Sequence, residues 1–65
     1  MSNAEMGARL RFLRGKRSRA EVAEILDISV STLQMYENGN RVPRDETKKK
    51  LADLYQTSVE ALFFT

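Results

Sequence analysis

The sequence predicts a small all-α domain of five helices. Apolar residues recur at intervals of three and four, the spacing of one helix face, in each stretch between turn signals. A serine that can cap a helix precedes most of these stretches. The chain has 65 residues, so five helices leave no room for long loops. We therefore expect residues 1–65 to form a single domain.

The composition restricts what such a domain can do. Cysteine and histidine are both missing, which excludes disulfides and the usual zinc sites. The apolar runs are only a few residues long, too short for a membrane span or a signal-peptide core. We expect a cytoplasmic protein with no membrane contact, and no cofactor, metal or small-molecule ligand is indicated. The few acidic pairs resemble helix-start charges, so we do not expect an enzyme.

The first predicted helix begins after Ser2, which forms a capping box with Glu5. Gly15 is a plausible C-terminal stop for this helix. Phe12 lies off the apolar stripe, so we expect it to pack beneath another helix, with a partner surface as the alternative. The stripe itself consists of Met6, Leu10 and Leu13.

Residues 18–38 predict two short helices joined by a turn at Asp27 and Ile28. Ser18 and Glu21 form a second capping box, and Ser29 is the cap candidate for the next helix. So short a turn makes the two helices cross steeply, and Ala23 is small enough to permit their close approach. The pattern is that of a helix-turn-helix, whose second helix is free to enter a DNA major groove. The wedge between the helices is filled by Val22, Leu26, Ile28 and Leu33.

Two further helices complete the chain. The turn signal at residues 38–40 and the extended backbone before Pro43 separate them from the helical pair. We expect the fourth helix to run from Arg44 or Asp45 to about Gln56. Ser58 caps a last helix from Val59 to about Phe63. One short helix cannot bury three consecutive apolar residues, so we expect at least one of Leu62, Phe63 and Phe64 to be exposed or to meet a second subunit in a homodimer.

The charges are distributed unevenly around a formal net charge of +2. Six basic residues stand between positions 9 and 19 with no acid among them, and five between positions 41 and 50. Any one of these charges can simply be a solvated side chain on a helix surface. Together the two groups flank the helical pair in sequence, where contacts with DNA phosphates would be useful.

Several motifs together resemble the Cro/repressor-type (lambda-repressor-like, XRE) helix-turn-helix family. They are Leu10-Arg11-x-Leu13-Arg14, Ser18-x-x-Glu21-Val22-Ala23, Ile28-Ser29-x-Ser31-Thr32-Leu33, Tyr36-Glu37-Asn38-Gly39-x-Arg41-x-Pro43 and Val59-Glu60-x-Leu62-Phe63. The likeness covers residues 6–64. It implies a five-helix, lambda-repressor-like domain that binds double-stranded operator DNA, usually as a two-fold symmetric dimer on a palindromic site. A transcriptional regulator is the implied function, with repression the expected sign.

The resemblance also implies roles for individual residues. The start of the third helix should face the bases, with contacts from Val30, Ser31, Thr32, Gln34 and Met35. No arginine or lysine stands on this helix, so apolar contacts and DNA shape should carry much of the specificity. The alternative is that Val30 and Met35 belong to the core.

Phosphate contacts and one internal ion pair are implied in the same way. The family's phosphate clamp corresponds to Arg19, Ser29, Asn38, Asn40 and Arg41, with weaker additions from Lys16, Arg17 and Arg44. Arg14 and Glu37 resemble the pair that ties the first helix to the end of the third. A different function remains open on the same fold, namely a protein-interaction module such as an antirepressor, antitoxin or adaptor.

Overall fold

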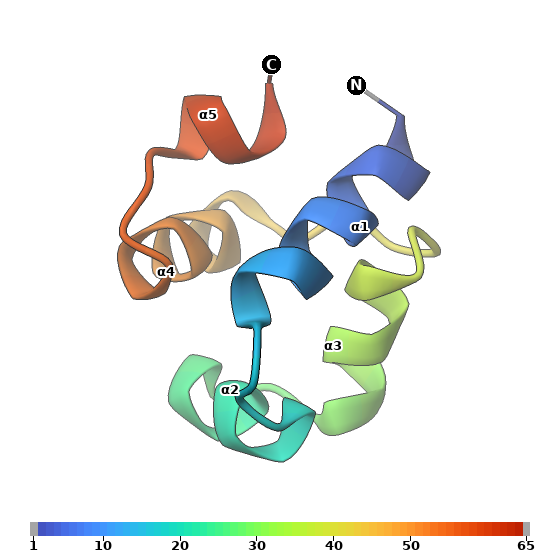
Figure 1. Cartoon of the computed structure of the whole chain (residues 1–65), viewed down its shortest axis with the longest axis vertical. Helices are drawn as coiled ribbons and strands as arrows, with labels where there is room; N and C mark the ends of the chain where they lie inside the picture. The colour runs from blue at the N-terminus through green and yellow to red at the C-terminus, as the bar shows by residue number, and fades with distance from the viewer. Residues whose placement is uncertain (1, 65) are drawn as a thin grey trace.

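A computed structural model describes residues 2–64, which form five α-helices and no strand (Figure 1). Their bounds are Asn3–Arg14 (α1), Arg19–Leu26 (α2), Val30–Glu37 (α3), Asp45–Leu54 (α4) and Val59–Phe63 (α5). The all-α architecture of five helices predicted from the sequence is confirmed. None of the described helices is long and apolar enough to cross a membrane.

Serine caps set four of the five helix starts. The hydroxyl oxygens of Ser2, Ser18, Ser29 and Ser58 each accept a hydrogen bond from the backbone N–H three residues later. These bonds satisfy amides that the first turn of a helix leaves without a partner. The helix α4 starts differently, because its cap residue Arg44 makes no side-chain cap and its first turn carries Asp45 and Glu46 instead.

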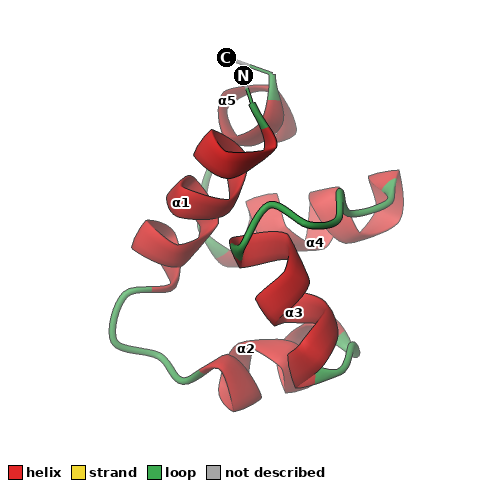
Figure 2. Cartoon of the chain, turned by 90° about the vertical axis from the view of Figure 1, so that its right-hand side faces the viewer, coloured by secondary structure: helices red, strands yellow, loops and turns green. Residues whose placement is uncertain are grey.

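The helices α2 and α3 cross steeply and form the lower part of the molecule in Figure 1, while α1 runs across the centre and packs on α3. The helices α4 and α5 pack on each other and close the other side of the core (Figure 2). The beginning of α1 and the end of α5 lie on the same side of the molecule. The helix α2 lies at the opposite end (Figure 1).

One apolar core is shared by all five helices. Its members include Leu10 from α1, Leu33 from α3 and Leu51 from α4, each with no exposed surface. Ala23 is buried between α2 and its neighbours, as its small side chain predicted. Ile28 is partly buried and packs against the core from the turn. The wedge of apolar residues expected between α2 and α3 is thus present.

The structure corrects three expectations. Phe12 does not pack beneath another helix, since its side chain is 83% exposed. Leu62 and Phe63 are buried in the core and are not available as a dimer surface, whereas Phe64 is exposed, as expected for at least one of the three. The helix α4 ends at Leu54, before Gln56, because Gln56 has a φ of 54° and its N–H bonds to Asp53 in a terminal turn.

Candidate nucleic-acid interface

The turn between α2 and α3 fixes the angle at which the two helices cross. Asp27 ends α2 with φ 58° and ψ 45°, a left-handed conformation that aspartate adopts more readily than most residues. The N–H of Ile28 then bonds to the carbonyl of Ala23 at 3.0 Å, which satisfies a carbonyl at the end of α2. A single left-handed residue is therefore enough to redirect the chain into α3.

The first turn of α3 is organised by two hydroxyl groups. The N–H of Thr32 donates to Ser29 Oγ at 3.1 Å, and the Ser29 hydroxyl donates to Thr32 Oγ1 at 2.8 Å. Ser29 therefore uses its own hydroxyl hydrogen within the chain. The other amide groups of the first turn remain directed along the helix axis toward the solvent, where an anion can bind.

The five residues expected to contact bases lie on the side of α3 that faces away from the core. Val30 is 43% exposed and Met35 is half-buried, and neither belongs to the core cluster. The residues that α3 buries are Leu33, Tyr36 and Glu37. The alternative in which Val30 and Met35 are core residues is therefore excluded. The exposed side chains of this face are Val30, Ser31 and Gln34, with Thr32 and Met35 half-buried.

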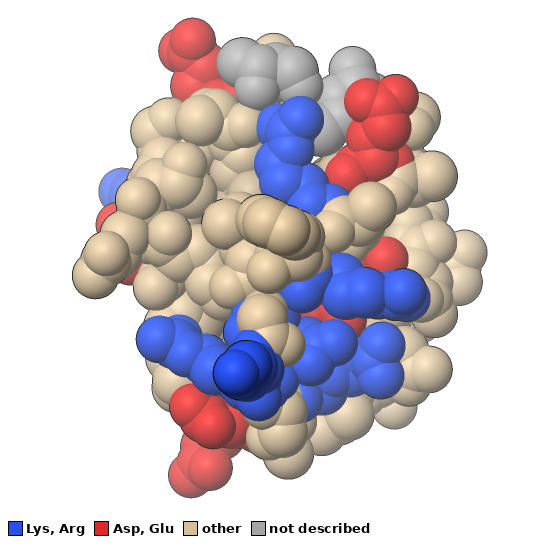
Figure 3. All heavy atoms as spheres, viewed as in Figure 1, with Lys and Arg blue, Asp and Glu red and all other residues tan. Residues whose placement is uncertain are grey.

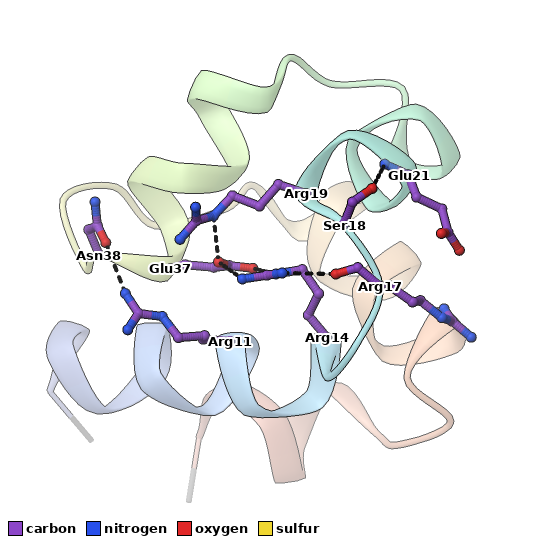
Figure 4. Close-up of polar contacts among 8 residues, drawn as sticks. All are labelled: Arg11, Arg14, Arg17, Ser18, Arg19, Glu21, Glu37 and Asn38. Atoms are coloured by element: carbon purple, nitrogen blue, oxygen red, sulfur yellow. Dashed lines mark hydrogen bonds and ion pairs between the residues drawn. The ribbon is translucent and has the colours of Figure 1, made fainter.

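Glu37 at the end of α3 binds two arginines at once (Figure 4). Arg14 of α1 donates from Nε to Oε2 at 2.7 Å and from Nη2 to Oε1 at 3.1 Å, a bidentate contact. Arg19 of α2 donates from Nε to Oε1 at 3.0 Å. The hydrogen bond with Glu37 raises the pKa of Arg14 above its ordinary value. The expected Arg14–Glu37 pair is thus present, and it joins three helices because Arg19 takes part.

Two contacts in this region were not anticipated from the sequence. Arg19 was expected at a phosphate only, but its Nε–H is bound to Glu37, which leaves the N–H groups of its terminal nitrogens for an outside acceptor. Arg11 was given no role, yet its Nη2 donates to Asn38 Oδ1 at 3.5 Å (Figure 4). Arg11 precedes Arg14 by three residues, so both lie on the side of α1 that faces α3. This three-residue spacing is the sequence feature from which the contact of Arg11 with the end of α3 could have been predicted.

The segment after α3 approaches α1 closely. Gly39 has φ 76°, and a Cβ atom there would lie 2.8 Å from the Asn3 carbonyl oxygen, so glycine is required at this position. Asn38, Asn40 and Arg41 are exposed around it. The side chains expected to contact phosphates in this loop are thus presented on the surface next to the C-terminal end of α3.

Basic side chains gather over the C-terminal end of α1 and its connection to α2 (Figure 3). Lys16 and Arg17 are exposed in this connection. The Arg17 carbonyl accepts a bond from Arg14 Nη1 at 2.8 Å, while the Arg17 side chain extends away from Glu37, on the side opposite Asn38 (Figure 4). The structure therefore separates Arg17 from the loop that follows α3.

An open pocket of about 240 Å³ lies between the end of α1 and the end of α4. Tyr55 lines it, and the Tyr55 hydroxyl is buried with no hydrogen-bond partner among the described residues. Burial, and to a lesser extent the negative charge of Glu37, raise the pKa of Tyr55. Within residues 2–64, no group of three or more acidic side chains could hold a metal ion.

Comparison with known families decides the identity of this arrangement. A family model described as a helix-turn-helix domain matches residues 5–62, which covers all of α2 and α3 and nearly all of the other helices. The chain belongs to the helix-turn-helix family. Searches of curated proteins and of solved structures return no match to it. Membership of this family, with the resemblance to its Cro/repressor-type branch, indicates a DNA-binding regulator.

Proposed function

We propose that this helix-turn-helix domain binds double-stranded DNA in a sequence-specific manner and acts as a transcriptional repressor. The observation that carries the proposal is the outer face of α3, where uncharged side chains are exposed between a helix N-terminus and a loop of amide and arginine side chains. A major groove accommodates one helix, and its base edges offer both hydrogen-bonding groups and thymine methyls.

In this proposal the face of α3 reads bases. Gln34 can form hydrogen bonds with both N6 and N7 of adenine. The hydroxyls of Ser31 and Thr32 can bond either a donor or an acceptor on a base edge. Val30 and Met35 can pack on thymine methyls. None of the residues of α3 is cationic, so a bidentate arginine contact to guanine is not available from this helix. Specificity then depends on A·T-rich positions and on DNA shape.

The phosphate contacts in this proposal come from two sides of α3. Arg19 offers its terminal nitrogens from α2, and Asn38, Asn40, Arg41 and Arg44 follow α3. Ser29 contributes through the amides that it orders, since its hydroxyl hydrogen is bound to Thr32. Lys16, which is exposed, remains a weaker candidate, whereas Arg17 lies outside this set because its side chain points away from the loop after α3 (Figure 4).

We further propose that the domain binds a palindromic operator as a homodimer. Phe64 is 65% exposed at the end of α5, and Lys48 Nζ lies 4.9 Å from the centre of its ring. A second subunit that covers this ring would remove a large apolar side chain from water. Sedimentation of the free protein and of its complex with a palindromic duplex tests this point. A monomer in both states would overturn it.

Selection from randomised duplex DNA at two salt concentrations, followed by sequencing, tests the main proposal. We expect a palindrome to be enriched and affinity to fall steeply with salt. Gln34→Ala should relax the preference at one position of each half-site, whereas Arg41→Ala should weaken all sequences alike and reduce the salt dependence. Lys49→Ala on α4 is the control and should change neither. If the folded protein enriches no DNA sequence, the function of a protein-interaction module is favoured instead. The absence of charge on the exposed face of α3 is compatible with that function too.

A further inference from the structure

Two exposed apolar side chains lie outside the surface proposed for DNA. Phe12 on α1 is 83% exposed, and Ile25 on α2 is 54% exposed. Gly7 faces α3, because a Cβ atom there would lie 2.3 Å from the Glu37 carbonyl oxygen. Phe12 follows Gly7 by five residues, which turns it about 140° around the helix. Phe12 therefore points away from α3 and stays accessible when α3 is bound to DNA.

Two basic residues stand near Phe12 in the chain. Lys16 and Arg17 follow it just beyond the end of α1, and both are exposed. The guanidinium group of Arg17 extends away from Glu37 (Figure 4). Neither residue takes part in any of the three ion pairs found among the described residues. We call Phe12, Lys16 and Arg17 the basic α1 face.

The surroundings of Ile25 are acidic. Glu21 lies one helical turn before it on the same side of α2, and Glu24 is its neighbour in sequence; both are exposed. Acidic side chains are visible over α2 at the lower edge of the molecule, directly beside the basic group (Figure 3). Neither glutamate belongs to an ion pair within residues 2–64. We call Glu21, Glu24 and Ile25 the acidic α2 face.

We propose that the chain associates with a second copy of itself by docking the basic α1 face of one copy on the acidic α2 face of the other. Each face combines one exposed apolar side chain with two charges of one sign, and the signs are opposite. Contact would cover Phe12 and Ile25 and bring four unpaired charges into two opposite-charge pairs. Opposite charges steer the approach, and the apolar pair holds the contact.

The expected association is weak and depends on salt. Two small faces bury less area than a stable dimer needs, and their exposed charges are screened as ionic strength rises. Such a contact becomes effective when two copies are held close together, as on neighbouring sites of one DNA molecule. The proposal does not depend on DNA binding, so it is tested with the full chain in the absence of DNA.

The experiment measures the average molecular mass by sedimentation over about a hundredfold range of protein concentration, at low and high salt. Two double variants with reversed charges are compared. One carries Lys16→Glu and Arg17→Glu, and the other carries Glu21→Lys and Glu24→Lys. We expect the mass of the natural chain to rise more steeply with concentration at low salt than at high salt. Each reversed variant alone should lose the salt-dependent part of the association, and an equimolar mixture of the two should regain it, because their faces are again of opposite charge.

A pair of apolar variants keeps the test independent of the charge changes. Phe12→Ala should weaken association at least about tenfold, whereas Val42→Ala, which removes an exposed apolar side chain outside both faces, should leave it unchanged. Circular dichroism confirms that every variant is folded. A mass that does not change with concentration overturns the proposal. So does a mixture of the two charge-reversed variants that fails to associate. A Phe12→Ala chain that associates as strongly as the Val42→Ala chain would also overturn it.

Discussion

At the residue scale, Glu37 is the charged side chain that the described part of the chain buries most deeply. Its side chain has no exposed surface, while those of Arg14 and Arg19 are 15% and 33% exposed. A buried carboxylate of this kind is tolerated because guanidinium groups meet both of its oxygens. Its removal leaves two arginines beside the core without their acceptor.

Glu37→Gln should therefore lower the free energy of unfolding by about 3–5 kcal/mol. Glu46→Gln is the control, because Glu46 is exposed and lies 4.0 Å from Lys50, and its loss should cost less than about 0.5 kcal/mol. Urea unfolding of both variants measures the difference. A double-mutant cycle on Arg14 and Glu37 with a coupling energy near zero would contradict this account.

The left-handed turn residue supplies a second prediction. Asp27 sits at φ 58°, where a side chain costs about 1 kcal/mol relative to glycine. Asp27→Gly should leave the fold intact and should not lower the melting temperature. Asp27→Ala, which keeps a Cβ atom but loses the polar side chain, should be less stable than Asp27→Gly. A large loss of stability in Asp27→Gly would mean that the turn depends on the carboxylate.

The hydroxyl of Tyr55 supplies a third prediction about stability. Because that oxygen is buried without a partner among the described residues, Tyr55→Phe should leave the unfolding free energy unchanged or raise it by about 1 kcal/mol. The raised pKa of Tyr55 means that the unfolded chain loses this proton first as pH increases. The natural chain should thus lose stability above the ordinary tyrosine pKa, and Tyr55→Phe should lose less. Thermal unfolding at neutral and alkaline pH measures both effects.

At the scale of elements, the contact between α1 and α3 depends on a glycine within a helix. A Cβ atom on Gly7 would lie 2.3 Å from the Glu37 carbonyl oxygen and 2.9 Å from that of Tyr36. Both neighbours are backbone atoms, so they cannot move aside without shifting α3. The position of α3 is therefore set partly by the absence of a side chain on α1.

Gly7→Ala should destabilise the domain by about 1–3 kcal/mol, because the two helices must separate to admit the methyl group. The sign is informative, since the same change on an exposed helix surface stabilises by about 1 kcal/mol. Ala8→Gly on the exposed side of α1 is the matched control and should cost about 1 kcal/mol through propensity alone. A Gly7→Ala chain more stable than the natural one would show that α1 and α3 are farther apart than described.

The elements also show what the sequence could and could not predict. Helix starts were predictable because a serine cap acts within one turn of chain, as at Ser18 and Ser29. The end of α4 was placed too late because nothing local distinguishes Gln56 from a helical residue. Phe12 was misplaced because periodicity finds the packed face of a helix but not whether a second face is covered. The bond from Arg19 to Glu37 depends on how α2 meets α3, which only the fold determines.

At the scale of the whole molecule, every described helix contributes to one core, and the Cα radius of gyration is only 10.3 Å. A chain of this size buries about 60% of its unfolded surface. Its stability therefore amounts to a few kcal/mol, so each variant above removes a substantial part of it. This is why folding must be checked before any loss of DNA binding or of association is assigned to a surface.

The shared carboxylate of Glu37 also has a consequence for how the domain opens. Its partners belong to α1 and α2 while it belongs to α3, so none of these helices can detach without breaking the same ionic cluster. Backbone amides in the three helices should accordingly exchange with deuterium through one common opening, while those of α5 exchange earlier. In Arg19→Gln, which removes only the partner from α2, the amides of α2 should begin to exchange separately from those of α1. The two arginines thus make three short helices behave as one cooperative unit.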